Sequence, residues 1–315
     1  MIKTPLCDLL GIRYPIIQGG MAWVATPELA AAVSNAGGLG IVGAGSAPPE
    51  VVRRMLRRTR ELTDRPFGAN VPLFTAGAEA ALEVFAEEKV GVVTTGGGNP
   101  GPFLERLQRA GIRVIPVVAS VALAKRVARQ GADAIVAEGM EAGGHVGDVA
   151  TMPLIPQVVD AVSIPVIAAG GIADGRGLAA ALALGAAGIQ MGTRFICTVE
   201  CQAHPNYKRK ILEAHDRATM VTGGSMGHPV RSLRGPFVRR FEEMERAGAS
   251  EADVMALGTG SLRVAMEEGD LERGSFMAGQ TAGMIDDIPT VQALIERIIT
   301  EAEAALHRAA SLLSD

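Results

Sequence analysis

Residues 164–195 read IPVIAAGGIADGRGLAAALALGAAGIQMGTRF and contain one strand–helix unit followed by the start of another. The run PVIAAGG is apolar without alternation, which is typical of a parallel strand buried on both faces. The helix-like segment RGLAAALALG ends on a glycine, and glycine fits the left-handed position that follows a helix. A second apolar run, GIQMGT, comes within a few residues. This stretch therefore predicts two parallel strands joined by a helix.

The same unit recurs along most of the chain. Its helix-to-strand junction is repeated in NAGGLGIVG, RAGIRVIPV, RQGADAIVA and ALGAAGIQM. Eight apolar runs are strand candidates: YPIIQGG, LGIVGAG, FGANVPL, VGVVTTGGG, RVIPVVA, AIVAEG, PVIAAGG and GIQMGT. Eight serial βα units favour an α/β fold of the TIM (β/α)8 barrel type over a doubly wound sheet. The doubly wound alternative is weakened further because no early G-x-G-x-x-G lies between a strand and a helix.

The regular alternation ends after Thr193. Residues from about 200 to 270 show no βα repeat and are rich in charge, glycine and methionine. We expect them to form a small, mainly helical insertion after the last strand, placed as a lid beside the barrel mouth. The expected division is residues 1–199 and 276–315 for the barrel and residues 200–275 for the substrate-side lid. The chain closes with an amphipathic helix predicted from about Thr290 to Leu313.

Composition argues against several classes of function. The 315-residue chain has a formal net charge of −4 and 3% aromatic residues, whereas nucleic-acid binding needs a basic face and stacking aromatics. No apolar run reaches the roughly 18 residues that span a bilayer, so no membrane partner is expected. The N-terminal segment MIKTPLCDLLGIRYPIIQGG is unlike a signal peptide. Three cysteines are too few for a disulfide framework, so we expect a cytoplasmic protein. Cys197 and Cys201 have no second cysteine pair to complete a zinc site, so we expect no metal.

Two glycine-rich strand ends predict a phosphate site. In a barrel, the loops that follow the strands build the active site, and phosphates often bind after strands seven and eight. The seventh and eighth candidate strands are followed by AAGGIADGRG and MGTRF. Gly170, Gly171 and Gly192 would present backbone N–H groups, and Thr193 would add a hydroxyl. The helix that begins near Asp174 is expected to contribute its positive N-terminal end.

Other strand ends carry small or hydrogen-bonding residues that suit a flat cofactor. Glycine lets a ligand approach the backbone, and amide side chains both donate and accept hydrogen bonds. Taken singly, each residue is as well explained by core packing or loop capping, but together at one barrel mouth they describe a pocket. The expected cofactor-binding residues are Gly20, Met21, Ala22, Asn70, Glu138, Gly143, Gly144, Gly170, Gly171, Gln190, Gly192, Thr193, Met277 and Gln280.

Motifs spread over the chain resemble one family. IIQGGMAWVA, RPFGANV, AEGMEAGGHVG, IPVIAAGGIADGRG, QMGTRF, HPNYKRKI and ERGSFMAGQTAG are similar to segments of the flavin-dependent enoyl-acyl-carrier-protein reductases. These enzymes belong to the wider nitronate monooxygenase, or 2-nitropropane dioxygenase, family, and the resemblance runs from about Pro5 to Gly283. It implies a TIM barrel that binds FMN through its phosphate at the two glycine-rich strand ends. It also implies that the rest of the flavin lies along Met21, Ala22, Asn70, Glu138 and Gln280.

The resemblance implies a reaction as well. NAD(P)H would reduce FMN, and flavin N5 would then deliver hydride to the β-carbon of an enoyl thioester on acyl carrier protein. His145, in the glycine-rich stretch EGMEAGGHVGD, matches the family's active-site histidine. Its ordinary pKa of about 6.5 makes both protonation states accessible at neutral pH, so it would either donate a proton to the substrate or orient it.

Basic residues of the lid are expected to meet a phosphopantetheine arm or an acidic carrier protein. They are Lys208, Arg209, Lys210, Arg231, Arg234, Arg239 and Arg240. A homodimer is compatible with the family.

Three other functions remain open at this point. A nitronate monooxygenase would use the same fold and flavin to oxidise alkyl nitronates with O2. A flavin-free barrel would bind a phosphorylated sugar or nucleotide, and purified protein without a flavin spectrum would indicate it. A non-catalytic flavin-binding protein would hold a flavin that no electron donor reduces.

Overall fold

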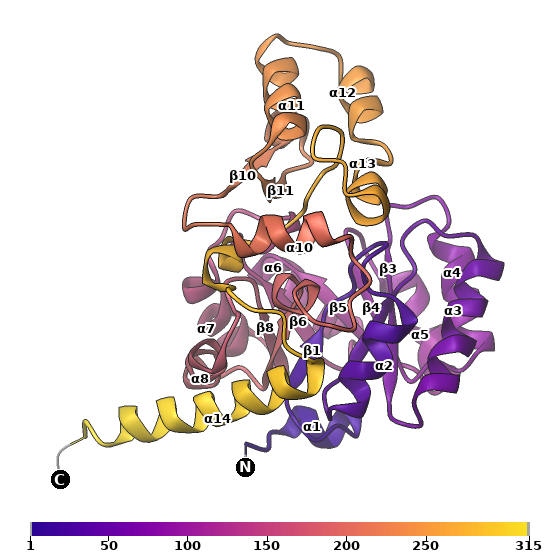
Figure 1. Cartoon of the computed structure of the whole chain (residues 1–315). Helices are drawn as coiled ribbons and strands as arrows, with labels where there is room; N and C mark the ends of the chain where they lie inside the picture. The colour runs from indigo at the N-terminus through magenta and orange to yellow at the C-terminus, as the bar shows by residue number, and fades with distance from the viewer. Residues whose placement is uncertain (1, 314–315) are drawn as a thin grey trace.

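The computed structural model describes residues 2–313 and shows eight parallel strands closed into a barrel (Figure 1). The strand order is β1-β9-β8-β6-β5-β4-β3-β2, and a bridge between Ile17 and Leu39 closes the ring between its first and last strands. The TIM barrel and all eight predicted strands are therefore confirmed. The strands are β1 (Ile16–Gln18), β2 (Gly40–Gly43), β3 (Phe67–Pro72), β4 (Val92–Gly96), β5 (Arg113–Val118), β6 (Ile135–Glu138), β8 (Val166–Ala169) and β9 (Gly188–Met191).

Helices cover the outside of the barrel (Figure 1). They are α2 (Pro27–Asn35), α3 (Pro49–Leu62), α4 (Ala78–Glu87), α5 (Gly101–Arg109), α6 (Val121–Arg129), α7 (Thr151–Ala161), α8 (Gly175–Ala183) and α14 (Val291–Ala310). The sequence patterns did not indicate α7, which contains Pro156. Proline is a helix breaker in most sequence settings, so its presence hid this element. Within residues 2–313, no helix is both long and apolar enough to cross a bilayer.

Glycines end four of these helices as the recurring junctions predict. Each lies in the left-handed region that a residue with a Cβ adopts only at a cost. They are Gly37 (φ 93°), Gly111 (φ 78°), Gly131 (φ 97°) and Gly185 (φ 92°). The chain can therefore turn from helix to strand within a few residues, which keeps the βα units short enough to close the barrel.

A short helix, α1 (Pro5–Leu10), closes the end of the barrel away from the lid (Figure 1). Its Leu6 is 0% exposed and packs with interior side chains such as Ile17 and Ile167. A Cβ on Gly188 would come within 2.6 Å of the Leu6 side chain, so the strand needs glycine at that point. The opposite end, where the strands have their carboxyl ends, is left as the mouth.

The insertion stands over the mouth as a lid (Figure 1). After the short helix α9 (Thr193–Ile196), its elements are α10 (Pro205–Leu212), β10 (Thr219–Thr222), η1 (Gly224–Met226), β11 (Val230–Leu233), α11 (Pro236–Arg246), α12 (Glu251–Gly258), α13 (Ser261–Arg263) and the π-helix η2 (Val264–Glu268). A 3-10 helix, η3 (Gln280–Met284), leads back to the barrel. Helices predominate, as expected. The sequence patterns did not indicate the strands, which form an antiparallel sheet in the order β10-β11-β7, where β7 (Gly144–His145) comes from the loop after β6.

The packing of α1 against the end of the barrel predicts an effect on stability. Leu6→Ala removes a fully buried side chain and should lower the free energy of unfolding by about 2–5 kcal/mol, measured by denaturant titration. Leu312→Ala is the matched control, because that side chain is 82% exposed. Its effect should stay within about 0.5 kcal/mol. Equal effects of the two substitutions would contradict the assignment of α1 as part of the core.

Candidate functional site

Several of the expected cofactor-binding residues lie near the carboxyl ends of the strands, at the mouth of the barrel. In β6, Glu138 pairs in register with Ala169 of β8, and Ala169 pairs with Gln190 of β9. On the other side of the ring, Asn70 of β3 pairs with Thr94 of β4 and donates from Nδ2 to its hydroxyl at 3.0 Å. Residues far apart in sequence therefore share the rim of the mouth beneath the lid.

The turn after β1 lies directly against Asn70. A Cβ on Gly20 would overlap the Asn70 side chain, so this position has room only for glycine. The next residue, Met21, reaches across to β9, where its Sδ lies 3.4 Å from the Cβ position of Gly192. Ala22 follows, and its Cβ is 3.4 Å from the Cβ position of Gly45 after β2. The β1 turn is thus packed among three other strand ends.

The glycines after β8 have the backbone freedom that the sequence predicts. Gly170 and Gly171 have φ angles of 84° and 72°. A Cβ on Gly170 would come within 2.7 Å of the carbonyl oxygen of Gly139, so both the dihedral angle and the space select glycine. The Thr151 side chain borders this turn, with its Oγ1 3.0 Å from the Gly170 carbonyl oxygen.

The expected contribution of α8 to a phosphate site is wrong. Its N-terminal N–H groups already have partners: the N-cap Asp174 accepts from Arg176 and Gly177, and Glu301 of α14 accepts from Gly175 at 2.9 Å. Two carboxylates at one helix end leave no favourable place for a further anion. The glycine turns themselves, together with Thr193, remain as the phosphate-binding candidates.

Thr193 links the mouth to the returning chain. It is 8% exposed, and its Oγ1 accepts from the Gly279 N–H at 2.9 Å. Its own hydroxyl hydrogen is still available to a ligand. Met277 and Gln280 lie on the same returning segment, where Met277 Sδ is 3.6 Å from the Cβ position of Gly144. Gln280 is exposed and donates its backbone N–H to the Glu141 carbonyl at 2.9 Å.

Gln190 provides the test of whether a polar cofactor fits. Gln190 is 7% exposed, and its side-chain Oε1 is buried without a hydrogen-bond partner among the described residues. Buried polar atoms are nearly always paired, so an acceptor left bare at a strand end points to a donor from a ligand. The adjacent Gly19 has no side chain, and a Cβ there would lie 3.0 Å from Cδ of Gln190. The site therefore offers the bare backbone and the free acceptor that a flavin would need.

Glu138 has a shifted charge state. The residue keeps some accessible surface, but protein atoms surround its carboxyl group densely enough to desolvate it. Desolvation raises the pKa of Glu138 from 4.5 to about 7. At neutral pH this carboxyl group is therefore partly protonated and can donate as well as accept a hydrogen bond.

His145 lies on the two-residue strand β7 (Gly144–His145), which belongs to the lid sheet. It pairs with Val230 of β11, and its ring lies 5.1 Å from the Phe74 ring at a tilt of 54°. The residue keeps accessible surface, but surrounding protein atoms partly desolvate the imidazole. This desolvation and, to a smaller extent, His228 lower the pKa of His145. The neutral form is therefore favoured at neutral pH, and it still carries one N–H donor.

The loop between β6 and β7 is held at both ends by one lid residue, Arg231. Its Nε and Nη2 donate to the Met140 carbonyl at 3.2 and 3.0 Å, and its backbone pairs with Gly144. Arg231 is 5% exposed, so the expectation that it meets a carrier protein is wrong. Lys208 is also engaged internally, because its Nζ donates to the carbonyls of Thr198 and Cys201 at 2.7 and 2.6 Å.

Glu141 was missed in the sequence and is the second support of this loop. Its carboxylate accepts from the backbone N–H of Thr151 at 3.0 Å and from the Thr151 hydroxyl at 2.9 Å. A Cβ on Gly143 would lie 2.6 Å from the Ala278 carbonyl carbon, so the loop also packs tightly on the returning segment. Only the position of Glu141 within EGMEAGGHVGD, three residues after Glu138, could have drawn attention to it.

The cysteines near the mouth are not reactive groups. Cys197 is buried, and desolvation raises its pKa to about 12. A thiol in this state is not a nucleophile at neutral pH. Across residues 2–313, no three His, Cys, Asp or Glu side chains gather as ligands for a metal ion.

The chain is similar to known proteins over most of its length. The family model described as Nitronate monooxygenase matches residues 3–87 and 73–301. The solved structure of FabK from Thermotoga maritima is 52% identical with a TM-score of 0.98, covering 99% of this chain and 100% of that one. Nitroalkane oxidase from Streptomyces ansochromogenes is 34% identical with a TM-score of 0.86, covering 97% of this chain and 99% of that one.

Related sequences carry two kinds of name. A protein of Mycobacterium tuberculosis, (3aS,4S,5R,7aS)-5-hydroxy-7a-methyl-1-oxo-octahydro-1H-indene-4-carboxyl-CoA dehydrogenase, is 37% identical over 99% of each chain. Nitronate monooxygenase of Paraburkholderia phytofirmans is 34% identical over 98% of each chain. These likenesses extend over the barrel and the lid together.

The shifted pKa of Glu138 predicts a pH-dependent effect on stability. Below about pH 4.5 the carboxyl is protonated in both states, but above it the unfolded chain ionises while the folded protein resists ionisation up to about pH 7. The folded state is therefore progressively penalised as pH rises. In flavin-free protein, Glu138→Gln should gain stability over the wild type between pH 5 and pH 8, by up to about 3 kcal/mol in the free energy of unfolding. A difference that stays constant with pH would show that the carboxyl is not desolvated.

Proposed function

The chain belongs to the nitronate monooxygenase family of flavin-dependent oxidoreductases, and we propose that it reduces the double bond of enoyl thioesters held on acyl carrier protein, with FMN as cofactor and NAD(P)H as electron donor. The observation that carries this proposal is the 52% identity to FabK, an enoyl-acyl-carrier-protein reductase, over barrel and lid alike. Identity to the nitroalkane oxidase is lower, at 34%. The relative named as a carboxyl-CoA dehydrogenase also supports a thioester substrate for this fold.

The rim residues divide into two groups for holding FMN. The turns at Gly170, Gly171 and Gly192 offer backbone N–H groups to the phosphate, and Thr193 offers its hydroxyl. The remaining flavin would lie along residues that combine bare backbone with polar side chains: Gly20, Met21, Ala22, Asn70, Glu138, Gly143, Gly144, Gln190, Met277 and Gln280. When bound, the flavin would take two electrons from NAD(P)H and supply hydride to the β-carbon of the substrate.

His145 would act on the substrate at the lid side of the mouth. As hydride reaches the β-carbon, negative charge develops on the thioester oxygen, and a hydrogen-bond donor there lowers the barrier. The neutral imidazole of His145 retains one such donor, and the residue is exposed. Arg231 would contribute only through His145, because its guanidinium bonds to the loop and not to the open mouth.

A nitronate monooxygenase is the second candidate, favoured by the family model and by the relatives of that name. The two functions differ in what reduces the flavin. In an anaerobic stopped-flow experiment, rapid bleaching of bound flavin by NADH or NADPH supports the reductase. Bleaching by an alkyl nitronate alone would overturn the proposal and support the oxygenase.

The role of His145 gives a kinetic prediction. His145→Ala should keep its flavin and its reduction by NAD(P)H, while turnover of a short enoyl thioester falls by about 10²-fold or more. His307→Ala, an exposed histidine on α14, is the matched control and should retain full turnover. If the His145 variant turned over at the control rate, His145 would have no part in the mechanism.

The unpaired Gln190 predicts opposite effects on cofactor and fold. Gln190→Leu should weaken FMN binding by about tenfold or more, measured as a Kd by fluorescence titration, because a donor on the cofactor loses its acceptor. The flavin-free variant should be as stable as the wild type or more stable, since a buried acceptor without a partner is removed. Gln157→Leu changes an exposed glutamine on α7 and serves as the control. Unchanged FMN affinity in the Gln190 variant would remove this residue from the cofactor site.

A further inference from the structure

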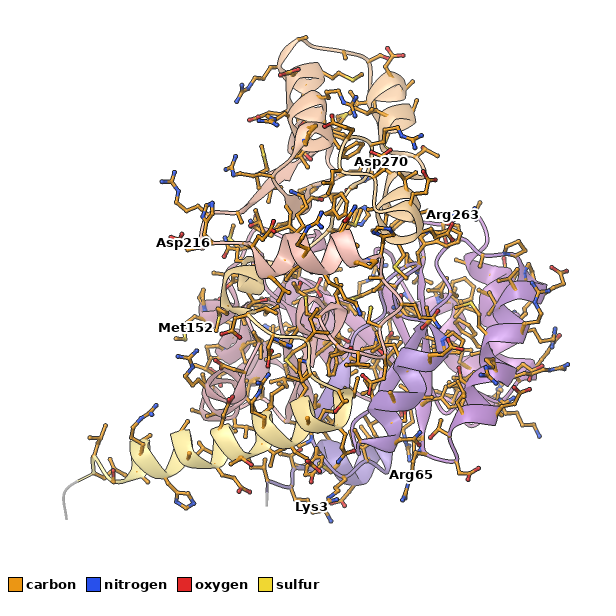
Figure 2. The ribbon with its side chains drawn as sticks, viewed as in Figure 1. Lys3, Arg65, Met152, Asp216, Arg263 and Asp270 are labelled. Atoms are coloured by element: carbon orange, nitrogen blue, oxygen red, sulfur yellow. The ribbon has the colours of Figure 1, made fainter. Side chains whose placement is uncertain are left out.

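Four basic residues form a surface cluster, here called the lid patch: Lys210, Arg217, Arg234 and Arg239. Lys210 comes from the end of α10, Arg217 from the loop before β10, Arg234 from the connection between β11 and α11, and Arg239 from the first turn of α11. Lys210 Nζ donates to the Arg234 carbonyl at 2.5 Å, and Arg234 Nε donates to the Arg217 carbonyl at 3.2 Å. Arg239 acts electrostatically on Lys210. Asp216, labelled in Figure 2, marks the side of the molecule where this loop meets the barrel.

Most of the charge of the lid patch is not neutralised. Among the described residues, no carboxylate lies within ion-pair distance of Arg217, Arg234 or Arg239, and all three are exposed. The nearby carboxylates have other partners: Glu213 lies 3.9 Å from Arg209, and Asp216 lies 3.4 Å from His215. The protein therefore leaves this positive charge facing solvent.

The basic face of α3 behaves differently. Its Arg53 and Arg60 pair with Glu88 at 3.0 and 2.9 Å, and Arg57 pairs with the same carboxylate at 3.0 Å. These ion pairs hold the pKa of Glu88 at about 2. Arg53, Arg57 and Arg60 are thus committed to a structural network, and Arg58 pairs with Glu28 and Glu61. The basic charge of α3 is therefore largely neutralised, whereas that of the lid patch is not.

The lid patch lies behind the segment that borders the mouth. Lys210 Nζ is 5.8 Å from the centre of the Phe276 ring, and Phe276 accepts from the Leu233 N–H at 2.8 Å. The next residue, Met277, has its Sδ 3.6 Å from the Cβ position of Gly144, beside His145. A partner seated on the lid patch would therefore be close to the entrance of the proposed reaction site.

We propose that the lid patch docks an acidic carrier protein and so delivers the thioester to the mouth. This inference rests on the proposed function. The whole chain has a formal net charge of −4 and would repel an acidic protein at long range, so productive encounter needs a local basic surface. The cations stand on separate segments with exposed guanidinium groups, an arrangement that suits a protein surface better than an enclosed pocket for a small anion.

The test compares carrier-linked with truncated substrate in flavin-loaded enzyme. Arg217→Glu with Arg239→Glu reverses two charges whose side chains make no hydrogen bond to the rest of the described chain, so folding should be preserved. The KM for crotonyl-acyl-carrier protein should rise about tenfold or more, while kcat and the KM for the crotonyl thioester of N-acetylcysteamine stay unchanged. Arg54→Glu, an exposed arginine on α3, is the matched control and should leave both KM values unchanged.

A binding measurement separates this proposal from the proposed function. Labelled holo-acyl-carrier protein is titrated with flavin-loaded enzyme and followed by fluorescence anisotropy, which needs no turnover. Weaker binding in the double variant alone supports the docking surface even if enoyl reduction is absent. Equal binding by wild type and double variant, or equal losses on both substrates, would overturn it.

Discussion

The hydrogen bonds from Arg231 to the Met140 carbonyl are the contact on which the site depends. The same residue pairs through its backbone with Gly144, so one lid side chain holds the loop 140–144 at its start and at its end. A charged donor makes one of the stronger hydrogen bonds to a carbonyl, and leaving this partly buried carbonyl without a partner would cost about 1–3 kcal/mol. His145 follows barrel strand β6 in the sequence, but contacts with the lid hold it in place.

Other contacts join lid and barrel around the same mouth. The Phe74 ring lies against His145. Arg263 of the lid, labelled in Figure 2, lies 4.9 Å over the Trp23 ring. Trp23 holds a φ of 66°, a strained value for a bulky residue, in the turn that also carries Met21. Such a backbone conformation persists only where the surrounding contacts hold it in place. Here Arg263 of the lid provides one of those contacts.

The barrel could be predicted from the sequence because its signals are local. Apolar runs without alternation marked all eight strands, and glycine at the helix ends marked the turns that join them. The lid sheet could not be predicted. Its third strand is two residues long, Gly144–His145, and pairs with a segment whose burial depends on the whole lid being in place. A two-residue strand in a glycine-rich loop has no periodicity to detect.

For the site, sequence reasoning located the rim but not the hydrogen bonds that hold it. Strand-end positions identified Asn70, Glu138 and Gln190, because parallel strands deliver their ends to one place. The expectation for the α8 N-terminus failed because Glu301 comes from α14, far along the chain. The charge of Arg231 suggested a surface role, and only the fold shows that its guanidinium is buried.

We propose that the lid positions His145 for the substrate step and not for reduction of the flavin. Arg231→Lys keeps the positive charge but cannot make both hydrogen bonds to the Met140 carbonyl. We expect this variant to fold. In anaerobic stopped flow, we expect NAD(P)H to reduce its flavin at close to the wild-type rate, while reoxidation by an enoyl thioester slows by about 10²-fold. Reoxidation at the wild-type rate, or equal loss of both steps, would contradict the account.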